Sequence, residues 1–435
     1  MISCKCSGDQ ASGRNLVICI DGTSNKYGDK NTNIVELYSE MVKDSKQLTY
    51  YNSGVGTYAK GHTHWMKQIE SVFDLAFAFN ISRTIMGAYR WLSDTYRPGD
   101  KIFLFGFSRG AYQVRVLAGM IHEIGLILPG NIEQIPYAYE LYSAINSGRQ
   151  KDKLLAAGFR STFSRRVVIH FIGVWDTVSS VGIRKEKILP STDTCDHICC
   201  FRQGLALDER RVKFLPEYVY GGTSNRAESQ LAQPPNNAVK DVKEDNVKEV
   251  WFAGSHSDMY TGKALNFQDM PLLWMREEAF DAGLLLNPPK IAFRFEDLKE
   301  PKINDSLTLR WWLLELLPVR HLCYNNSNQH TVVPHVGKGR TILPGQKVHA
   351  SVLFRAHYRS KASFWRNLQQ WPEAIHFHVA YDQEQLGDAW EVPFNRSTAE
   401  DLVGTIHKKH TLDYVDRLAF MCSFGEIPDH FDILT

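Results

Sequence analysis

The sequence contains no run of about 18 apolar residues, the length that a membrane-spanning helix needs. Residues 1–15 also lack the apolar stretch of about 7–15 residues that marks a secretory signal. Neither sign of charge dominates, because the formal net charge is only +2 over 435 residues. Such a balance gives no general attraction for nucleic acid. We therefore expect a cytoplasmic protein with no transmembrane helix and no nucleic-acid partner.

Cysteine is too scarce for a disulfide framework, with eight residues in the whole chain. In a chain without a secretory signal, these cysteines are expected to be reduced thiols. Cys195, His197, Cys199 and Cys200 are of the types that bind zinc, but their spacing fits no usual structural zinc pattern. A reduced cluster within an expected loop over 183–204 is the favoured interpretation, and a zinc site is the alternative.

Composition is that of an ordinary globular protein, with 43% hydrophobic and 23% charged residues. Short apolar runs alternate with segments of helical periodicity, which predicts an α/β fold whose mostly parallel central sheet is flanked by helices. The expected strands are residues 16–20, 48–51, 102–105, 167–174 and 247–254. The expected helices are residues 34–42, two within 66–96 that meet at Asn80, 111–121, 135–147, 150–157, 270–282 and 399–408.

The domain organisation is expected to be one large domain with additions. Residues 1–14 are predicted to be a disordered leader, and residues 15–290 an α/β-hydrolase-like catalytic domain. A polar stretch over 221–247, rich in Asn, Gln, Pro and charge, is expected to be a mobile insertion. The remaining residues, 291–435, are expected to form a C-terminal extension that serves as a lid or an accessory region.

One stretch carries the strongest chemical signal, a short apolar strand that runs into Gly106-Phe107-Ser108-Arg109-Gly110 and then into an amphipathic helix. A Gly-x-Ser-x-Gly turn between strand and helix is the nucleophile elbow of α/β-hydrolases. The helix N-terminus behind the serine offers backbone N–H groups to a developing oxyanion. The alternative is a tight glycine turn without chemistry.

Three expected strands end, in chain order, in Ser108, Asp176 and His256. Because ligands bind beyond the carboxyl ends of parallel strands, we expect these side chains at one edge of the sheet. Ser, Asp, His is the order of α/β-hydrolase triads. Serine would be the nucleophile, histidine the general base and acid, and aspartate the group that orients the imidazole.

Further residues at this edge have expected roles. The Arg109 N–H is the first expected oxyanion donor, and Gly22 and Thr23 are expected to supply the second. Asp258, two residues beyond the histidine, is the alternative acid. Asp21 is expected to have a structural or site-ordering role. An alternative places Asp21, Asp176 and Asp258 together as ligands of Mg²⁺ or Ca²⁺, but the favoured interpretation has no metal and no cofactor.

An apolar stripe over 311–317, with two tryptophans and four leucines, has two interpretations. A buried core helix is the favoured one. The alternative is a surface that contacts lipid.

The chain resembles the DUF2235 family of α/β-hydrolases. The resemblance rests on six motifs in order, over about residues 14–290: IDGTSN, GFSRGAYQVRVLAGMI, FIGVWDTVSSVG, LALDERRVKF, WFAGSHSDM and LLWMREEAFDAGL. The family includes the catalytic domain of the type VI secretion phospholipase effectors called Tle1 and many fungal proteins. The resemblance implies an α/β-hydrolase fold, a Ser–Asp–His site on Ser108, Asp176 and His256, and hydrolysis of lipid or phospholipid esters.

Two positions depart from the family pattern. Met259-Tyr260-Thr261 stands where a glycine run is usual, and Ser24 stands where tryptophan is frequent. Both lie at the expected rim, so they bear on substrate choice more than on mechanism. The favoured function is a serine hydrolase of a lipid or other acyl ester, with transient contact to a membrane surface. The alternatives are a non-catalytic binding member of the fold and a carboxylate-bound metal phosphoesterase.

Overall fold

The structure is a computed structural model in which the chain divides into two compact units. It describes residues 13–22, 31–54, 66–178, 189, 191–192, 194–222, 246–261, 269–288, 305–319, 321–325, 328–343, 346–349, 360–364, 376–378 and 391–393. The first unit comprises Met1–Tyr27, Met41–Phe201 and Asp281–Leu286. The second unit comprises Gly28–Glu40, Arg202–Phe280 and Asn287–Thr435. Each unit is described by itself.

The first unit contains a parallel sheet with its strands in the order β3-β1-β4-β7. The strands are β1 (Asn15–Ile20), β3 (Gln47–Asn52), β4 (Lys101–Phe107) and β7 (Ile169–Trp175). All four were predicted, and β1 and β7 are buried along their whole length. Strands that are covered on both faces favour continuous apolar runs, which explains why the sequence indicated them clearly. The predicted α/β architecture is confirmed.

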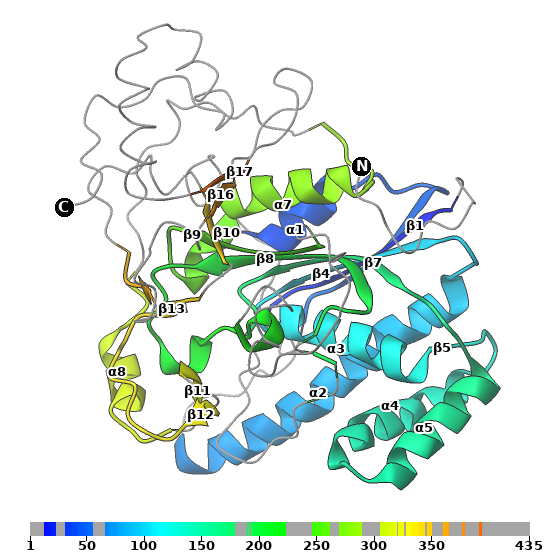
Figure 1. Ribbon diagram of the computed structural model, residues 1–435, viewed down its shortest axis with the longest axis horizontal. Coiled ribbons are helices and arrows are strands. Elements are labelled where there is room, and N and C mark those ends of the chain that lie inside the picture. Colours follow the sequence, from blue (N-terminus) through cyan, green and yellow to red (C-terminus); the bar gives the residue numbers. More distant parts are fainter. Residues whose placement is uncertain are drawn as a thin grey trace, which may run out of the picture. The chain divides into compact units, whose positions relative to one another are not determined.

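Four helices lie on one side of this sheet in Figure 1. They are α2 (Met66–Thr95), α3 (Arg109–Ile124), α4 (Ile135–Ala144) and α5 (Gln150–Phe163). The predicted break of α2 at Asn80 is wrong, because the helix runs unbroken for 30 residues. An asparagine costs a helix only a few tenths of a kcal/mol, roughly, so without glycine or proline the helix continues.

The segment Asp281–Leu286 returns late in the sequence to complete the first unit. The buried Gln47 side chain donates to the Leu285 carbonyl at 2.7 Å and accepts from the Leu285 N–H at 2.8 Å. Asn15 donates to both the Gln47 side chain and the Gly283 carbonyl. Polar side chains thus join this return segment to the beginnings of β1 and β3.

The second unit has its own run of strands in the order β17-β16-β14-β9. They are β9 (Val247–Phe252), β14 (Lys347–His349), β16 (His376–His378) and β17 (Glu391–Pro393). Two helices, α1 (Asn33–Glu40) and α7 (Met270–Asp281), are joined by an ion pair of 3.0 Å between Arg276 and Glu40. Figure 1 shows these helices side by side.

Strand β8 (Ile198–Ala206) begins in the first unit and ends in the second. The expectation of a loop over 183–204 is therefore wrong for its last seven residues. Arg202 and Gln203 made the segment look polar, but both are buried and paired. Arg202 binds Glu278, and Gln203 donates to the Glu249 carboxylate at 2.8 Å.

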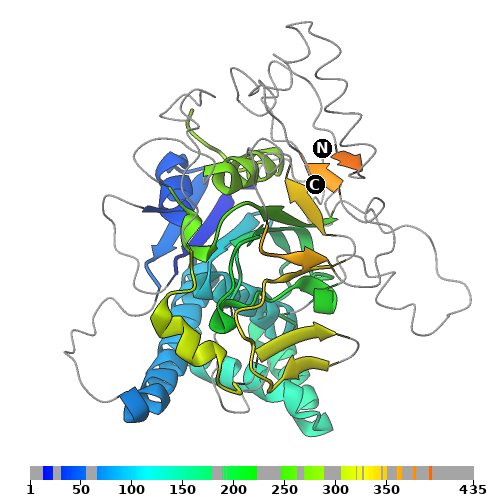
Figure 2. The same cartoon turned by 90° about the vertical axis from the view of Figure 1, so that its left-hand side faces the viewer.

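The second unit also contains α8 (Leu309–Glu315) and the hairpin of β11 (His321–Asn325) and β12 (Asn328–Thr331). Figure 2 shows helix and hairpin at the same end of this unit. Several predictions lie outside the described residues: the leader over 1–12, Thr23, Ser24, most of the insertion, at 223–245, and the helix over 399–408. No helix in the described ranges has both the length and the apolarity that crossing a membrane requires.

Candidate active site

Ser108 lies in the first unit, on the turn between β4 and α3. Its backbone has φ 56° and ψ −122°, a conformation that a residue with a side chain rarely adopts. The Ser108 N–H donates to the Trp175 carbonyl at 2.9 Å, and the Ser108 carbonyl accepts from the Val178 N–H at 3.3 Å. The residue is the N-cap of α3, yet its side chain makes no capping hydrogen bond. Serine at an N-cap usually hydrogen-bonds to the first turn of its helix, so capping does not explain why a serine occupies this strained turn.

Two glycines allow the turn to pack closely. A Cβ at Gly110 would lie 2.2 Å from the Ile20 carbonyl oxygen and 2.5 Å from that of Asp21. A Cβ at Gly106 would lie 2.5 Å from the Ala111 Cα. Rigid backbone surrounds both positions, so any side chain there would push α3 away from the sheet. The Gly-x-Ser-x-Gly spacing is therefore a packing requirement of this turn.

Asp176 lies beside Ser108 in the same unit. Strands β4 and β7 pair in parallel and end with Phe107 opposite Trp175. The residues that follow, Ser108 after β4 and Asp176 after β7, therefore come at the same edge of the sheet. Asp176 is fully buried and has φ 46°, a second strained backbone position at the same edge. Strain of this kind costs about 1–3 kcal/mol and is concentrated at functional sites.

Asp21 and Gly22 follow β1 at this edge. The buried Asp21 carboxylate accepts from the Gly22 N–H at 2.6 Å and from the Tyr51 hydroxyl at 3.2 Å. The Gly22 amide, an expected oxyanion donor, is thus directed at a carboxylate here. Asp21 thus holds the first amide after β1 and the Tyr51 hydroxyl, and its site-ordering role stays a prediction.

His256 lies in the second unit, at the start of a 3-10 helix over His256–Asp258 that follows β9. It is buried, with 6% of its surface exposed. Asp258, the alternative acid, closes a capping box: its Oδ2 accepts from the Ser255 N–H at 2.7 Å and from the Ser255 hydroxyl at 2.9 Å. These bonds give Asp258 a structural task in holding the His256 turn.

Two carboxylates that were not predicted from the sequence hold the His256 loop. Glu209 Oε2 accepts from the His256 N–H at 3.2 Å, and Asp208 Oδ2 accepts from the Gly254 N–H at 2.8 Å. Burial alone would raise the pKa of Glu209, but two hydrogen bonds from the Arg211 guanidinium outweigh it and hold that pKa below its usual value. The signal was the charged sequence Asp208-Glu209-Arg210-Arg211 directly after an apolar run.

Aromatic rings surround His256 on another side. The Phe214 ring meets the imidazole edge to face, with 4.8 Å between centroids, and meets the Trp311 ring at 5.6 Å. The Arg211 guanidinium lies 3.6 Å above the Phe214 centroid. The imidazole therefore packs against an aromatic ring on this side, while the Glu209 carboxylate holds its backbone N–H.

Helix α8 is not the buried core helix that the sequence favoured. Leu309, Leu316 and Leu317, within or next to it, are 88%, 59% and 50% exposed, whereas Glu315 is fully buried. The Glu315 carboxylate accepts from His335 at 2.7 Å and from the Gly337 N–H at 3.0 Å, which joins α8 to the segment over 332–337. That segment exposes Val332, Val333 and Val336 by 59%, 57% and 47%. We call these six side chains the apolar surface.

The structure does not gather the side chains of the cysteine cluster around one point. Among the described residues, no three His, Cys, Asp or Glu side chains are grouped as a metal site would need. Cys199 and Cys200 are neighbours in β8, so their side chains point to opposite faces. The cysteines of the described ranges are free thiols.

The site residues are therefore divided between the units. Ser108, Arg109, Asp176, Asp21 and Gly22 belong to the first unit, and the structure brings Ser108 and Asp176 together. His256 and Asp258 belong to the second unit. Tyr260 and Thr261, which stand where the family has a glycine run, pair with Thr32 and Asn31 as a short antiparallel ladder.

Comparison with known proteins gives a family match over residues 14–278, to the model described as "T6SS, Phospholipase effector Tle1-like, catalytic domain". The uncharacterized protein YEL023C of Saccharomyces cerevisiae is 34% identical over 281 residues, which cover 58% of this chain and 41% of YEL023C. The chain thus spans about two fifths of that relative's length.

Two solved structures are more distant. An uncharacterized protein from Pseudomonas aeruginosa has 14% identity and a TM-score of 0.33, over 67% of this chain and 48% of its own. The Tle1 effector bound to the VgrG spike of the type 6 secretion system has 18% identity and a TM-score of 0.29, over 58% and 52%.

Proposed function

Because the chain belongs to the family of Tle1-like phospholipase effector catalytic domains, we propose that it is a serine hydrolase that cleaves a lipid-like ester through an acyl-enzyme. The observation that carries the proposal is the strained Ser108 turn, tied by a hydrogen bond to Trp175, the residue that ends β7 and precedes Asp176. A nucleophile elbow of this kind presents its hydroxyl at the carboxyl edge of a parallel sheet.

The proposed reaction has two steps. His256 takes the proton of the Ser108 hydroxyl as the oxygen attacks the ester carbonyl, and returns that proton to the leaving alcohol. The acyl group remains on Ser108 until His256 activates a water molecule to release it as a carboxylic acid. Asp176 orients the imidazole and stabilises its charged form between the two transfers.

The oxyanion of each tetrahedral intermediate is assigned to the first turn of α3. The Arg109 N–H is the primary donor, since it follows the nucleophile directly and begins a helix. Gly22 and Thr23 are the proposed second donors, and the Gly22 N–H, which here donates to the Asp21 carboxylate, has to turn away from it to serve the oxyanion. A single donor of this type contributes about 2.7–4 kcal/mol to transition-state stabilisation.

The apolar surface supports a lipid substrate. Six aliphatic side chains are exposed on two segments of the second unit, which hydrogen bonds to Glu315 join to each other. Trp311 of α8 contacts Phe214, which contacts His256, so the region is continuous with the surroundings of the proposed base. Exposed apolar side chains of this kind fit transient contact with a membrane surface.

The experiment that tests the proposal is intact-mass labelling with a fluorophosphonate, which reacts only with an activated serine. We expect one adduct on the wild-type protein, none on Ser108→Ala, and slow or absent labelling of His256→Ala. Circular dichroism of each variant shows whether it is folded. A folded wild-type protein that stays unlabelled would overturn the proposal and favour a non-catalytic member of the fold.

A further inference from the structure

The first unit has a pocket of about 260 Å³ far from Ser108. It is lined by Ile121 and His122 near the end of α3, by Arg160 of α5, and by Arg166 to Val168 before β7. Ser108 precedes α3, whose rise of about 1.5 Å per residue separates His122 from it by roughly 20 Å. The pocket thus lies at the amino end of β7, and Asp176 follows the carboxyl end.

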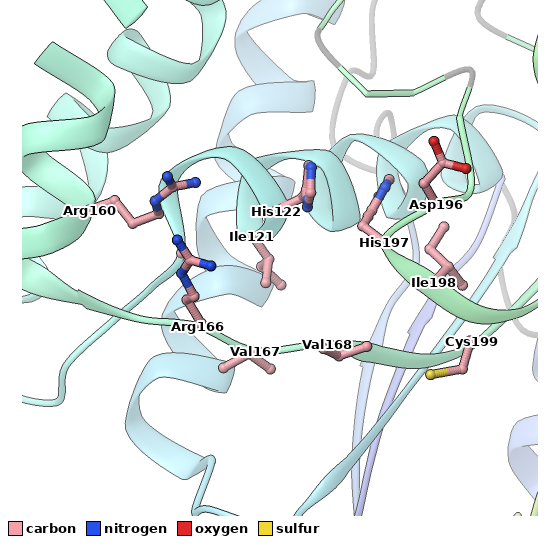
Figure 3. Close-up of a pocket in the computed structure, with 11 residues that line it drawn as sticks. Ile121, His122, Arg160, Arg166, Val167, Val168, Asp196, His197, Ile198 and Cys199 are labelled. Atoms are coloured by element: carbon pink, nitrogen blue, oxygen red, sulfur yellow. The ribbon is translucent and has the colours of Figure 1, made fainter. Parts of the chain in front are cut away.

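Two guanidinium groups lie at the same end of the pocket, as Figure 3 shows. Arg160 donates one hydrogen bond, to the Glu123 carbonyl at 3.2 Å. In the described part of the chain, neither Arg160 nor Arg166 forms an ion pair with a carboxylate. The carboxylate that does line the pocket, Asp196, lies at its other end in Figure 3. Two cations without a counterion in one concave site attract an anion of matching charge.

Two histidines form the upper rim of the pocket in Figure 3. The His122 and His197 rings are stacked, with 4.6 Å between centroids. Burial, together with the neighbouring His122, lowers the pKa of His197 to about 3, so this ring is neutral near pH 7. Its Nε2 is buried and, among the described residues, has no hydrogen-bond partner.

The rest of the wall is apolar, with Ile121, Val167, Val168 and Ile198. A bare inorganic anion would leave these side chains without a partner. The volume is below the roughly 300–1,000 Å³ of drug-sized sites, so the ligand is small. Guanidinium groups suit the oxygen geometry of phosphate, and two of them balance the two negative charges of a phosphomonoester.

We propose that this pocket is a binding site for a small phosphomonoester, whose phosphate lies between Arg160 and Arg166 and whose organic part contacts Val167 and Val168. The site is separate from the proposed catalytic serine, and the proposal does not depend on the proposed function. The phosphate can belong to a soluble metabolite or to the headgroup of a phosphatidic acid molecule, and the experiment distinguishes these sources.

The test is isothermal titration calorimetry of the full chain with sn-glycerol 3-phosphate, glycerol and inorganic phosphate. We expect glycerol 3-phosphate to bind, inorganic phosphate to bind at least fivefold more weakly, and glycerol not to bind. Flotation with phosphatidylcholine vesicles, with and without phosphatidic acid, tests whether the bound phosphate belongs to a lipid headgroup. Binding only to vesicles that contain phosphatidic acid would assign the site to a lipid phosphomonoester. A protein that binds neither glycerol 3-phosphate nor vesicles containing phosphatidic acid would overturn the proposal.

Variants locate the binding. Arg166→Gln, an exposed position, should weaken binding at least tenfold, whereas Lys151→Gln, which removes a charge from the opposite face of α5, should change it less than twofold. Val168→Asp places a carboxylate in the wall and should abolish binding, but its uncharged match Val168→Asn should stay within threefold. Equal binding by wild type, Arg166→Gln and Val168→Asp would contradict the assignment.

Discussion

The backbone N–H of Ser108 donates to the Trp175 carbonyl oxygen across 2.9 Å, so the turn that carries the serine is fixed to the residue before Asp176. Both Ser108 and Asp176 have positive φ values, 56° and 46°. One hydrogen bond thus joins the strained Ser108 to the residue just before the strained Asp176, and the relative placement of the two strained residues depends on the pairing of β4 with β7.

Asp176 is expected to matter for the reaction and Asp258 for stability. Asp176→Asn should lower kcat on a soluble ester by about 10⁴-fold, because the imidazole would lose its orienting carboxylate. Asp258→Asn should lower the free energy of unfolding by about 1 kcal/mol through loss of the capping box, with most activity kept. Steady-state kinetics and thermal unfolding separate these effects. Asp208→Asn is measured as a third variant. If it lowers kcat more than Asp176→Asn does, Asp208 and not Asp176 is the carboxylate that orients the imidazole.

Gly110→Ala should destabilise the first unit strongly. The added methyl would meet the Ile20 and Asp21 carbonyls at 2.2 and 2.5 Å, and backbone there cannot give way cheaply. We expect a loss of about 3 kcal/mol in the free energy of unfolding, measured by urea titration. Gly158→Ala is the matched control on exposed α5, where a Cβ meets nothing within 4 Å. This control should raise stability by about 0.5–1 kcal/mol, and equal effects at both glycines would contradict the argument.

The stability of the second unit should fall at acidic pH. Burial alone would raise the pKa of Glu209 and of Glu315, but hydrogen bonds outweigh it and hold both pKa values below the usual range. The donors are Arg211 for Glu209, and His335 with the Val212 and Gly337 amides for Glu315. A carboxyl whose pKa is lower when folded contributes stability above its unfolded pKa, near 4.3. That contribution is lost as the pH falls through the folded value. We therefore expect Tm to decline below about pH 4.

Glu209→Gln and Glu315→Gln test this expectation. Each should lower Tm at pH 7 and flatten its dependence on pH below about 5, whereas Glu133→Gln at an exposed position should follow the wild type. Parallel curves for all four proteins would show that these two carboxylates do not carry the effect.

The apolar surface is expected to matter only for aggregated lipid. Leu316→Asp or Leu317→Asp should lower hydrolysis of vesicle phospholipid about tenfold, because one buried leucine contributes about 1.5 kcal/mol to lipid contact. Hydrolysis of a short-chain soluble ester should be unchanged. Leu154→Asp, at a leucine of α5 that is 63% exposed, provides a control in the first unit. A parallel loss on both substrates would exclude a role in lipid docking.

Chelation should leave the reaction intact. A triad hydrolase uses serine and histidine, so incubation with EDTA should change neither fluorophosphonate labelling nor ester hydrolysis. Phosphodiester cleavage that EDTA abolishes and calcium or magnesium restores would support the metal phosphoesterase alternative instead.

The elbow could be predicted from sequence because its determinants are local. An apolar strand, two glycines and helical periodicity all lie within about 20 residues, and together they place Ser108 correctly. Strand β8 could not be predicted in this way, since the buried Arg202 is satisfied by Glu278, 76 positions further along the chain. Pairing at such a distance leaves no local pattern.

The same limit explains α8 and Glu209. The apolar sequence around α8 indicated burial, yet among the side chains of α8 that the structure describes the fully buried one is Glu315, held by His335 and two amides. Glu209 lies in a short charged sequence, and nothing local in that sequence indicates its bonds to Arg211 and the His256 N–H. Buried charge follows from tertiary partners, which hydrophobic periodicity does not encode.

The bond between Gln47 and Leu285 has a consequence for synthesis. The two residues are separated by 238 positions, so at about 5–20 residues per second the ribosome needs roughly 12–48 s to supply the partner of Gln47. During that interval the beginnings of β1 and β3 have amide groups without their final acceptors. The nascent first unit therefore exposes strand ends to chaperones or to other chains, and any truncation before residue 286 would make that exposure permanent.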